Sequence, residues 1–361
     1  MITSLIFYFG IFITSVGSAY VYAKSKNANK YIIFLIISFI SAYIPAALRY
    51  DVGVDNLEYL RLFYMLNEIP APEIKFPDIL FSEYLYVSLN KVIYFFGLDA
   101  QWFIIIMAFL TYFIIFISFP KRYLHILVLI LMTNLYFFSF NAVRQALSIA
   151  IVLYAVALFL EKKYIKTYIL LLIAIGFHKS FLFFLPIFFS FHFIKLNKPI
   201  MIFITIVGCF LANFVFRFNY IFSFLTNSAW DTSANALFLE EYGMTLGVLL
   251  RISLIVMPLI YCVLFSSNKS DKQDKTQNIL FLLFPLILIM EIYAKQIYLF
   301  VRFLSSFVAF YPLFLIYIVE NKCKYKKLFI SYIVIGYISV FGINIVKNHN
   351  GIIPYQTVLS K

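Results

Sequence analysis

Charged residues are scarce in this chain, and their scarcity excludes an ordinary soluble protein. Asp, Glu, Lys and Arg make up 12% of the 361 residues, against about 25% in soluble globular domains. Hydrophobic residues make up 64%, and the mean hydropathy is +0.95. Apolar runs recur along the whole chain, so no soluble domain of useful size can be separated from them. The composition predicts a polytopic membrane protein.

Cysteine is equally scarce, and the short motifs of several enzyme classes are missing. The three cysteines lie in two apolar runs and one basic break, so we expect none of them to form a disulfide. The sequence contains no GxxxxGKS or GxxxxGKT loop and no HExxH, CxxC or GxSxG pattern. It therefore gives no support to nucleotide hydrolysis, zinc proteolysis or α/β-hydrolase chemistry.

The net charge of +13 comes from a few short polar breaks. They hold 17 of the 29 basic residues and only four of the 16 acidic ones. By the positive-inside rule these breaks face the cytoplasm, so the excess reports topology and not nucleic-acid binding. The breaks are residues 24–30, 121–123, 161–166, 195–198, 266–276 and 320–327.

The apolar runs between the breaks predict membrane-spanning helices, because about 20 helical residues cross the hydrocarbon core. Residues 167–194 have basic breaks on both sides, so they should make two short passes with a turn near His178 and Lys179. Residues 79–96 carry too many polar groups for a lipid-facing span and predict an interfacial or re-entrant helix. The remaining candidates are 3–22, 31–48, 101–119, 124–141, 145–160, 199–216, 244–265, 277–294, 303–319 and 328–346.

These segments predict an all-α, polytopic transmembrane bundle of about 12 crossings, with both termini outside. We expect residues 1–361 to form a single integral membrane domain. Its external excursions are 49–78 and 217–243, and a polar tail follows Lys347.

Arginine is placed differently from lysine, since only Arg122 lies in a basic break. The other arginines lie near the outer ends of predicted crossings, where the positive-inside rule disfavours them. Arg61 and Arg217 lie in acid-containing loops, which favours ordinary ion pairs. The rest are bordered by apolar sequence and indicate an outer-leaflet site for a phosphorylated lipid, because the guanidinium fork fits phosphate oxygens. They are Arg49, Arg144, Arg251 and Arg302.

Two carboxylates follow the first of these arginines. Asp51 and Asp55 are four residues apart with Gly53 between them, so they would share a helix face or flank a turn. They could bind a divalent metal, act as a base, or hold Arg49 and Arg61 in place. An exposed acidic turn is the simpler alternative.

Two further polar groups interrupt apolar sequence. Arg144, Gln145 and Ser148 lie at the mouth of two predicted crossings, with Arg144 and Ser148 on one helical face. Snorkelling of Arg144 to lipid phosphates is an equally good explanation. His178 and Lys179 lie at the predicted turn of 167–194, where histidine is a suitable base near neutral pH. A packed, hydrogen-bonded histidine is the alternative.

Several segments together resemble the EpsG-type, Wzy-like polysaccharide polymerase family. The resemblance lies in the order of Arg49, Gly53, Asp55 and Tyr59, then an Arg-Gln pair opening a crossing, then His-Lys-Ser, a late arginine and a terminal Pro-Tyr. It covers almost the entire chain. The segments are RYDVGVDNLEY (49–59), FSEYLYVSLNKVI (81–93), FNAVRQALSIAIVLYAVALF (140–159), GFHKSFLFFLP (176–186), YLFVRFLSSFVAFYPLFLI (298–316) and IIPYQTVL (352–359).

The resemblance implies a GT-C-like bundle with an outer-face cavity, in the bacterial inner membrane. Such an enzyme joins undecaprenyl-pyrophosphate-linked repeats on the periplasmic face to build O-antigen, capsule or exopolysaccharide. Its partners would be that lipid-linked oligosaccharide, membrane lipids and a separate chain-length regulator, with no nucleic acid and no cofactor. No metal is required, because arginines can take its place at the leaving group.

The same resemblance assigns roles to the candidate residues. His178 is the first choice for the base that deprotonates the acceptor hydroxyl, and Asp55 is the second. Glu83, Asp51 and Gln145 would contact sugar. Cations would stabilise the departing pyrophosphate: Arg49, Arg144 and Arg302, with Lys179 and Arg251 as weaker candidates.

Two other functions share this composition. A lipid-linked oligosaccharide flippase also has many crossings and intramembrane charges, but alternating access predicts two related halves, which this sequence does not show. A membrane sugar acyltransferase would favour a histidine-centred site without needing several external arginines.

Overall fold

The computed structural model is helical over nearly all of the residues that it describes. These are residues 2–68, 83–217, 250, 253–254, 256–258, 260–261, 271–294, 303–320, 325–348 and 350–360. Within these ranges there is no strand, although an isolated antiparallel bridge joins Arg49 to Thr357. The all-α prediction is confirmed for this part of the chain.

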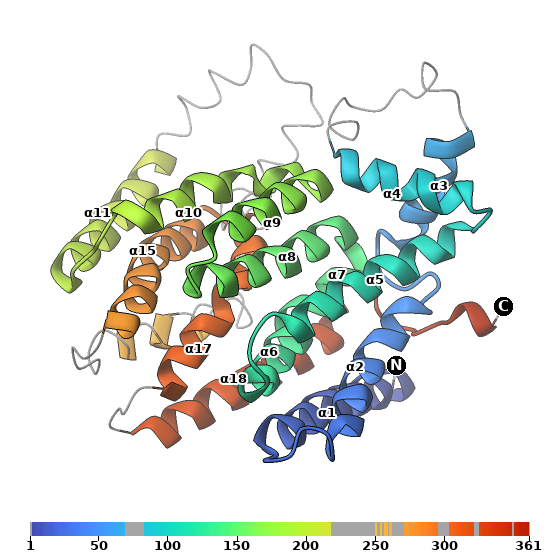
Figure 1. The fold of residues 1–361 in the computed structure, drawn as a ribbon, viewed down its shortest axis with the longest axis horizontal. Helices are drawn as coiled ribbons and strands as arrows, with labels where there is room; N and C mark the ends of the chain where they lie inside the picture. The colour runs from blue at the N-terminus through green and yellow to red at the C-terminus, as the bar shows by residue number, and fades with distance from the viewer. Residues whose placement is uncertain are drawn as a thin grey trace, which may run out of the picture. The chain divides into compact units, whose positions relative to one another are not determined.

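The chain divides into two compact units, and each is described by itself. The first unit comprises Met1–Leu185 and Tyr337–Lys361. A π-helical turn at Leu131–Leu135 follows α6, and a 3-10 turn at Lys179–Phe183 follows α9. The helices of this unit (Figure 1) are α1 (Ile2–Lys24), α2 (Ile32–Ala47), α3 (Asn56–Glu68), α4 (Tyr84–Phe95), α5 (Ala100–Ile117), α6 (Leu124–Ile130), α7 (Phe138–Asn141), α8 (Val143–Leu160), α9 (Tyr164–Phe177) and the end of α18 (Lys326–Lys347).

Helix α8 forms the centre of the first unit. It lies between α5 and α9 (Figure 1), and 83% of its residues are buried. Ala146, Ala150 and Ala155 are fully buried on it, and such small side chains let neighbouring helices approach closely. The polar residues near the start of α8 are therefore held on a firmly packed element.

Helices α4 and α9 meet at a glycine. A Cβ atom added at Gly176 would lie only 2.7 Å from the Leu85 side chain, so the two helices are closer than a larger residue would allow. Glu83 directly precedes α4, and His178 directly follows α9. The close approach therefore brings these two residues to the same place.

A segment near the C-terminus, residues 350–358, is bound to the loop between α2 and α3. We call this segment the C-terminal strap. The backbone N–H of Tyr50 donates to the carbonyl of Gln356 at 3.1 Å, and that of Val358 donates to the carbonyl of Leu48 at 3.0 Å. Sequence analysis predicted only a polar tail here. The structure shows that it is an integral part of the first unit.

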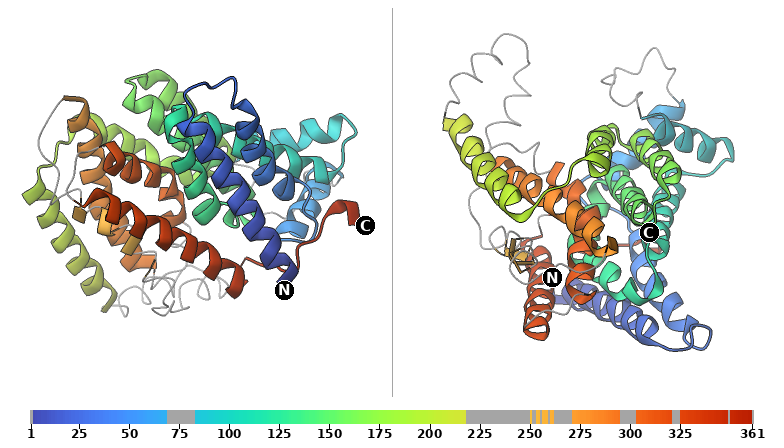
Figure 2. Two further views of the ribbon diagram at one scale, coloured as in Figure 1. Left: turned by 90° about the horizontal axis from the view of Figure 1, so that it is seen from below. Right: turned by 60° about the vertical axis from the view of Figure 1, so that its left-hand side comes forward.

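The strap is also bound to the first two helices. The Tyr8 hydroxyl donates to the carbonyl of Ile352 at 2.8 Å, and the Tyr355 hydroxyl donates to the carbonyl of Pro45 at 3.0 Å. The backbone N–H of Tyr355 donates to Ser4 Oγ at 3.3 Å. Figure 2 shows the start of α1 and the strap side by side.

The second unit, Pro186–Gly336, contains most of α10 (Phe184–Phe193), α11 (Lys198–Arg217), α15 (Asp271–Ala294), α17 (Tyr311–Glu320) and the start of α18. The Asn278 amide on α15 fixes the connection between α10 and α11. It donates to the carbonyl of Ile194 at 2.7 Å and accepts from the N–H of Leu196 at 2.9 Å. Helices α11 and α15 pack side by side (Figure 1).

Five described helices are long and apolar enough to cross a membrane, which supports the membrane prediction but not the expected 12 crossings. The run 31–48 forms only the 16-residue α2, and the run 124–141 is interrupted by the π-helical turn. Most of 244–265 lies outside the described residues. The five are Ile2–Lys24, Ala100–Ile117, Val143–Leu160, Phe303–Glu320 and Lys326–Lys347.

Two of the predicted irregular segments have the expected local structure. Helix α9 stops at Phe177, and His178 adopts an extended conformation before the 3-10 turn. Helix α4 has 12 residues, too few to cross a bilayer. Their positions relative to a membrane stay predictions, as does the single domain with excursions at 49–78 and 217–243.

Gly53→Ala tests the loop that the strap binds. Gly53 has a φ of +100°, and an added Cβ would lie 2.8 Å from Asn141 Oδ1 and 2.9 Å from the carbonyl of Phe140. We expect a loss of about 1–3 kcal/mol in the free energy of unfolding, because both strain and overlap oppose the substitution. Thermal unfolding in detergent measures it.

Gly10→Ala is the matched control, since a Cβ at Gly10 meets nothing within 4 Å. It should leave the unfolding temperature unchanged or slightly higher. Equal unfolding temperatures for Gly53→Ala and the wild type would show that the loop conformation is not required.

Candidate active site

The carboxylate of Glu83 joins three groups from separate elements of the first unit. His178 Nδ1 lies 2.7 Å from Glu83 Oε1, and the backbone N–H of Lys179 donates to the same oxygen at 3.3 Å. Arg144 Nη1 donates to Glu83 Oε2 in a close ion pair. The structure thus brings together a predicted base, a predicted phosphate-binding cation and a predicted sugar ligand.

Glu83 is ionised in this environment. Burial by itself raises the pKa of its carboxyl, but the hydrogen bond with His178 and the charge of Arg144 outweigh burial and lower that pKa below its ordinary value. An ionised carboxylate only accepts hydrogen bonds, so His178 Nδ1 carries the proton and donates it. In the neutral imidazole, Nε2 is then the nitrogen that can accept a proton.

The three side chains differ in exposure. Glu83 has 1% of its side-chain surface exposed, whereas Arg144 and His178 have 20% and 24%. A substrate can therefore reach the cation and the histidine, while the carboxylate that joins them lies beneath. Lys179, next to His178, is exposed.

Two tyrosine rings surround the Arg144 guanidinium. Its central carbon lies 4.9 Å from the ring centroid of Tyr86 and 6.0 Å from that of Tyr59, within the range of cation–π attraction. Both tyrosines are buried. The rings and the Glu83 carboxylate restrict where the guanidinium can lie.

The start of α8 is tied to the end of α9. Ser148 Oγ donates to the carbonyl of Ala174 at 2.9 Å and lies 3.1 Å from the carbonyl of Arg144, one turn earlier. Arg144 and Ser148 share a helical face, as predicted. Gln145, a predicted sugar ligand, is buried with 5% exposed.

Asp51 and Asp55 lie in a turn and not on one helix. Both are exposed, and Asp51 has a φ of 53°. The backbone N–H of Asp51 donates to the buried Asn56 side chain at 3.0 Å. Among the described residues no group of three His, Cys, Asp or Glu side chains is placed to hold a metal ion. Arg61, in the following helix, pairs with Glu58 at 3.7 Å, as expected.

Arg49 is held apart from the Glu83 cluster and has only 1% of its surface exposed. Nη1 donates to the carbonyl of Ala46 at the end of α2, and Nη2 donates to that of Phe140 at 3.4 Å. Its guanidinium also lies 4.8 Å from the Phe140 ring centroid. These contacts join the α2–α3 loop to α7.

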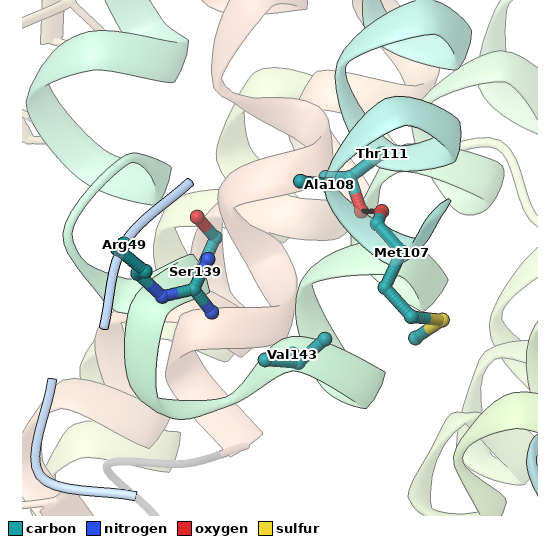
Figure 3. A pocket seen from close by; sticks show the side chains of 6 residues that line it. All are labelled: Arg49, Met107, Ala108, Thr111, Ser139 and Val143. Carbon is teal, nitrogen blue, oxygen red and sulfur yellow. Dashed lines mark hydrogen bonds between the residues drawn. The ribbon is translucent and has the colours of Figure 1, made fainter. Parts of the chain in front are cut away.

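A small cavity adjoins Arg49. Figure 3 shows Arg49 and Ser139 on one side, residues of α5 on the other, and Val143 at the start of α8. The space is about that of one water molecule, so it does not accommodate a pyrophosphate. It is not the large outer-face cavity that the family resemblance implied.

The C-terminal strap reaches the turn that precedes Arg144. Asn141 Nδ2, at the end of α7, donates to the carbonyl of Asn350 at 3.2 Å and to its side-chain oxygen at 3.1 Å. The N–H of Gly53 donates to the carbonyl of Gly351 at 2.9 Å. The strap thereby connects the α2–α3 loop with the start of α8.

Sequence reasoning did not assign roles to Tyr59, Tyr86 or the strap. Tyr59 ends the Arg49–Gly53–Asp55 pattern, and the strap contains the Pro-Tyr pair of the last segment, so both signals were present. No spacing rule connects Tyr86 with Arg144. Two predicted pyrophosphate ligands, Arg251 and Arg302, lie outside the described residues.

A family model, described as the EpsG family, matches residues 32–357. No curated protein and no solved structure matches the chain. The family match covers Glu83, Arg144 and His178 together with almost all of the strap.

The lowered pKa of Glu83 predicts how stability depends on pH. A carboxylate with a depressed folded-state pKa stabilises the protein above its ordinary value of 4.5, and this contribution is lost as the pH falls through the folded value. Glu83→Gln should therefore cost about 3 kcal/mol at pH 7, the low end for a broken buried pair because Arg144 is partly exposed. The difference from the wild type should shrink below about pH 4.5.

Chemical unfolding in detergent between pH 3 and pH 7 measures this dependence. Glu58→Gln is the matched control, because Glu58 is 55% exposed and its ion pair contributes little. A pH-independent difference between Glu83→Gln and the wild type would show that charge is not the basis of the effect.

Proposed function

The chain belongs to the EpsG family, a Wzy-like polymerase-type family, and from this premise we propose that it is a glycosyltransferase that polymerises lipid-linked oligosaccharide repeats. The donor is a growing glycan on undecaprenyl pyrophosphate. The acceptor is the terminal sugar hydroxyl of a single lipid-linked repeat. The product is O-antigen or another surface polysaccharide.

The proposed enzyme acts at the periplasmic face of the bacterial inner membrane. The support for this sidedness is the placement of charge in the sequence. Lysine-rich breaks favour the cytoplasm, whereas Arg49 and Arg144 occur between them at the opposite ends of apolar runs. Diphosphate linked to a membrane-embedded polyprenol would meet guanidinium groups at that level.

The reaction forms one bond and breaks one bond. The acceptor oxygen bonds to the anomeric carbon of the donor glycan, and the bond from that carbon to the pyrophosphate oxygen breaks. The pyrophosphate departs with the bonding electrons on its lipid. In our proposal the acceptor proton passes to His178 Nε2, because Nδ1 is bonded to Glu83.

Arg144 stabilises the negative charge that develops on the departing pyrophosphate. Nη1 is bonded to Glu83, and Nε is buried, so phosphate oxygens would contact the part of the guanidinium that remains exposed, since 20% of the Arg144 side chain is accessible. The exposed Lys179 adds a second cation beside it. Arg251 and Arg302 remain proposed contributors.

The proposal assigns Arg49 a supporting part. Its burial and its bonds to two backbone carbonyls favour a role in holding the loop before α3 and the turn before α8. The observation that carries the proposal is the shared carboxylate of Glu83, which sets a base and a cation side by side at a partly exposed place.

Arg144→Ala tests the pyrophosphate role in a strain that lacks its own copy of the gene. We expect the polysaccharide ladder to shorten to a single repeat on the lipid carrier. Losing one charge-assisted contact to a developing anion costs about 3–4 kcal/mol of barrier, a rate loss of a few hundredfold. Gel analysis of the lipid-linked glycan measures the ladder, and immunoblotting measures the protein level.

Arg61→Ala is the control, since Arg61 is 69% exposed and, within the described part of the chain, forms an ion pair only with its helix neighbour Glu58. It should leave the ladder unchanged. A normal ladder at normal protein level in Arg144→Ala would refute the role proposed for Arg144.

Polymerisation by the purified protein should survive chelation of divalent ions. Arginine and lysine charges replace a metal at the leaving group in this proposal. The test compares ladder formation with and without EDTA. Loss of activity that magnesium or manganese restores would instead reassign Asp51 and Asp55 as metal ligands.

A further inference from the structure

We infer that Glu83 is a positioning residue, which orients His178 and Arg144 for polymerisation and does not bind the acceptor sugar. This inference rests on the proposed function. It differs from the role that the sequence suggested, in which Glu83 contacts sugar directly. Four observations support it. Glu83 is buried, and both of its carboxylate oxygens accept hydrogen bonds within the protein. It lies at the start of α4, where α9 packs closely, and it holds the base and the cation on its two separate oxygens.

Both carboxylate oxygens of Glu83 are already bonded within the protein. Oε1 accepts from His178 Nδ1 at 2.7 Å and from the N–H of Lys179 at 3.3 Å, while Oε2 accepts from Arg144. With 1% of its side chain exposed, Glu83 presents almost no surface to a sugar. A sugar hydroxyl could therefore reach the carboxylate only if the residues that cover it moved.

The bond to Nδ1 selects the useful tautomer of His178. A carboxylate that accepts from Nδ1–H leaves Nε2 as the acceptor, and it stabilises the imidazolium formed when Nε2 takes a proton. The same carboxylate fixes the Arg144 guanidinium, so the base and the cation keep a constant separation. Holding groups in a reactive arrangement is a large part of catalysis.

The fold supports this role at the backbone level. Glu83 lies at the start of α4, where Gly176 lets α9 approach, and Ser148 ties α8 to α9. The three elements that carry the cluster are therefore joined to one another independently of Glu83. Removing the carboxylate should misorient side chains without separating the helices.

The charged and titratable groups near Glu83 lie on several elements of the first unit. Arg144 and Lys179 are cationic, Glu83 is the anion, and His178 forms no second ion pair within the described residues. The remaining ionisable neighbours are the two tyrosines over Arg144, namely Tyr59 and Tyr86.

The test uses the full-length protein in detergent and the lipid-linked repeat extracted from membranes of a strain that lacks the gene. Glu83→Gln should lower kcat about 100-fold or more and change KM for the lipid-linked repeat by less than about threefold. Glu58→Gln should behave as the wild type.

A double-mutant comparison distinguishes positioning from a merely structural role. If Glu83 acts partly through His178, Glu83→Gln should lower kcat less in a His178→Ala background than in the wild type, and the loss that remains should come from Arg144. Full additivity of the two losses would overturn the inference. A raised KM with unchanged kcat would also overturn it and indicate a sugar ligand.

Failure of the inference and failure of the proposed function give different results. If the wild-type protein does not lengthen the lipid-linked repeat, the proposed function is wrong. If the wild type polymerises and Glu83→Gln matches it, only the positioning role is wrong. Thermal unfolding verifies that each variant is folded. Should Glu83→Gln fail this check, Glu83→Asp takes its place, because it keeps the charge while its shorter side chain should still lower kcat by failing to hold His178 and Arg144 in the same positions.

Discussion

The buried carboxylate of Glu83 is the interaction on which the candidate site depends. An isolated carboxylate removed from water is expensive, and it persists only when charges and hydrogen bonds compensate for the loss of solvent. Here the compensation comes from a guanidinium, an imidazole and a backbone N–H, each on a different element. The contacts that stabilise the carboxylate therefore also hold Arg144 and His178 close together.

The charges of Arg144 and Arg49 are compensated by different kinds of contact. Arg144 has a carboxylate partner and two aromatic rings, and it keeps a fifth of its side chain exposed. Arg49 is almost fully buried, and its Nη1 and Nη2 donate to the backbone carbonyls of Ala46 in α2 and Phe140 in α7. The first arrangement leaves capacity for an anionic substrate, while the second stabilises a junction between chain segments.

Composition and charge placement were enough to predict the helical membrane architecture, because hydropathy and the cost of unsatisfied backbone groups act on every stretch of about 20 residues alike. Charge placement also predicted the helix break at His178, and the spacing of four residues predicted the shared face of Arg144 and Ser148. The expected number of crossings stays a prediction, since five described helices are long and apolar enough to span a membrane. Local features such as the π-helical turn at Leu131–Leu135 divide an apolar run without changing its hydropathy.

The partners within the site were harder to predict than its members. Glu83, Arg144 and His178 were each recognised as polar residues in apolar surroundings, but pairing depends on which helices pack together. That packing is set by features such as the contact between Gly176 and Leu85, which no periodicity in either segment reveals. Burial of Glu83 then changes its expected role, since a residue suited by type to bind sugar is inaccessible to it.

The strap has a consequence for biogenesis. The loop that contains Arg49 emerges early in synthesis, yet its backbone partners at Gln356 and Gly351 emerge much later, and Tyr8 and Ile352 are 344 positions apart. Contacts of such long range close slowly and only after the intervening chain has been inserted. During most of translation, the loop between α2 and α3 would therefore lack its hydrogen-bond partners in the strap. The first unit can complete these contacts only after residues 350–358 have been synthesised.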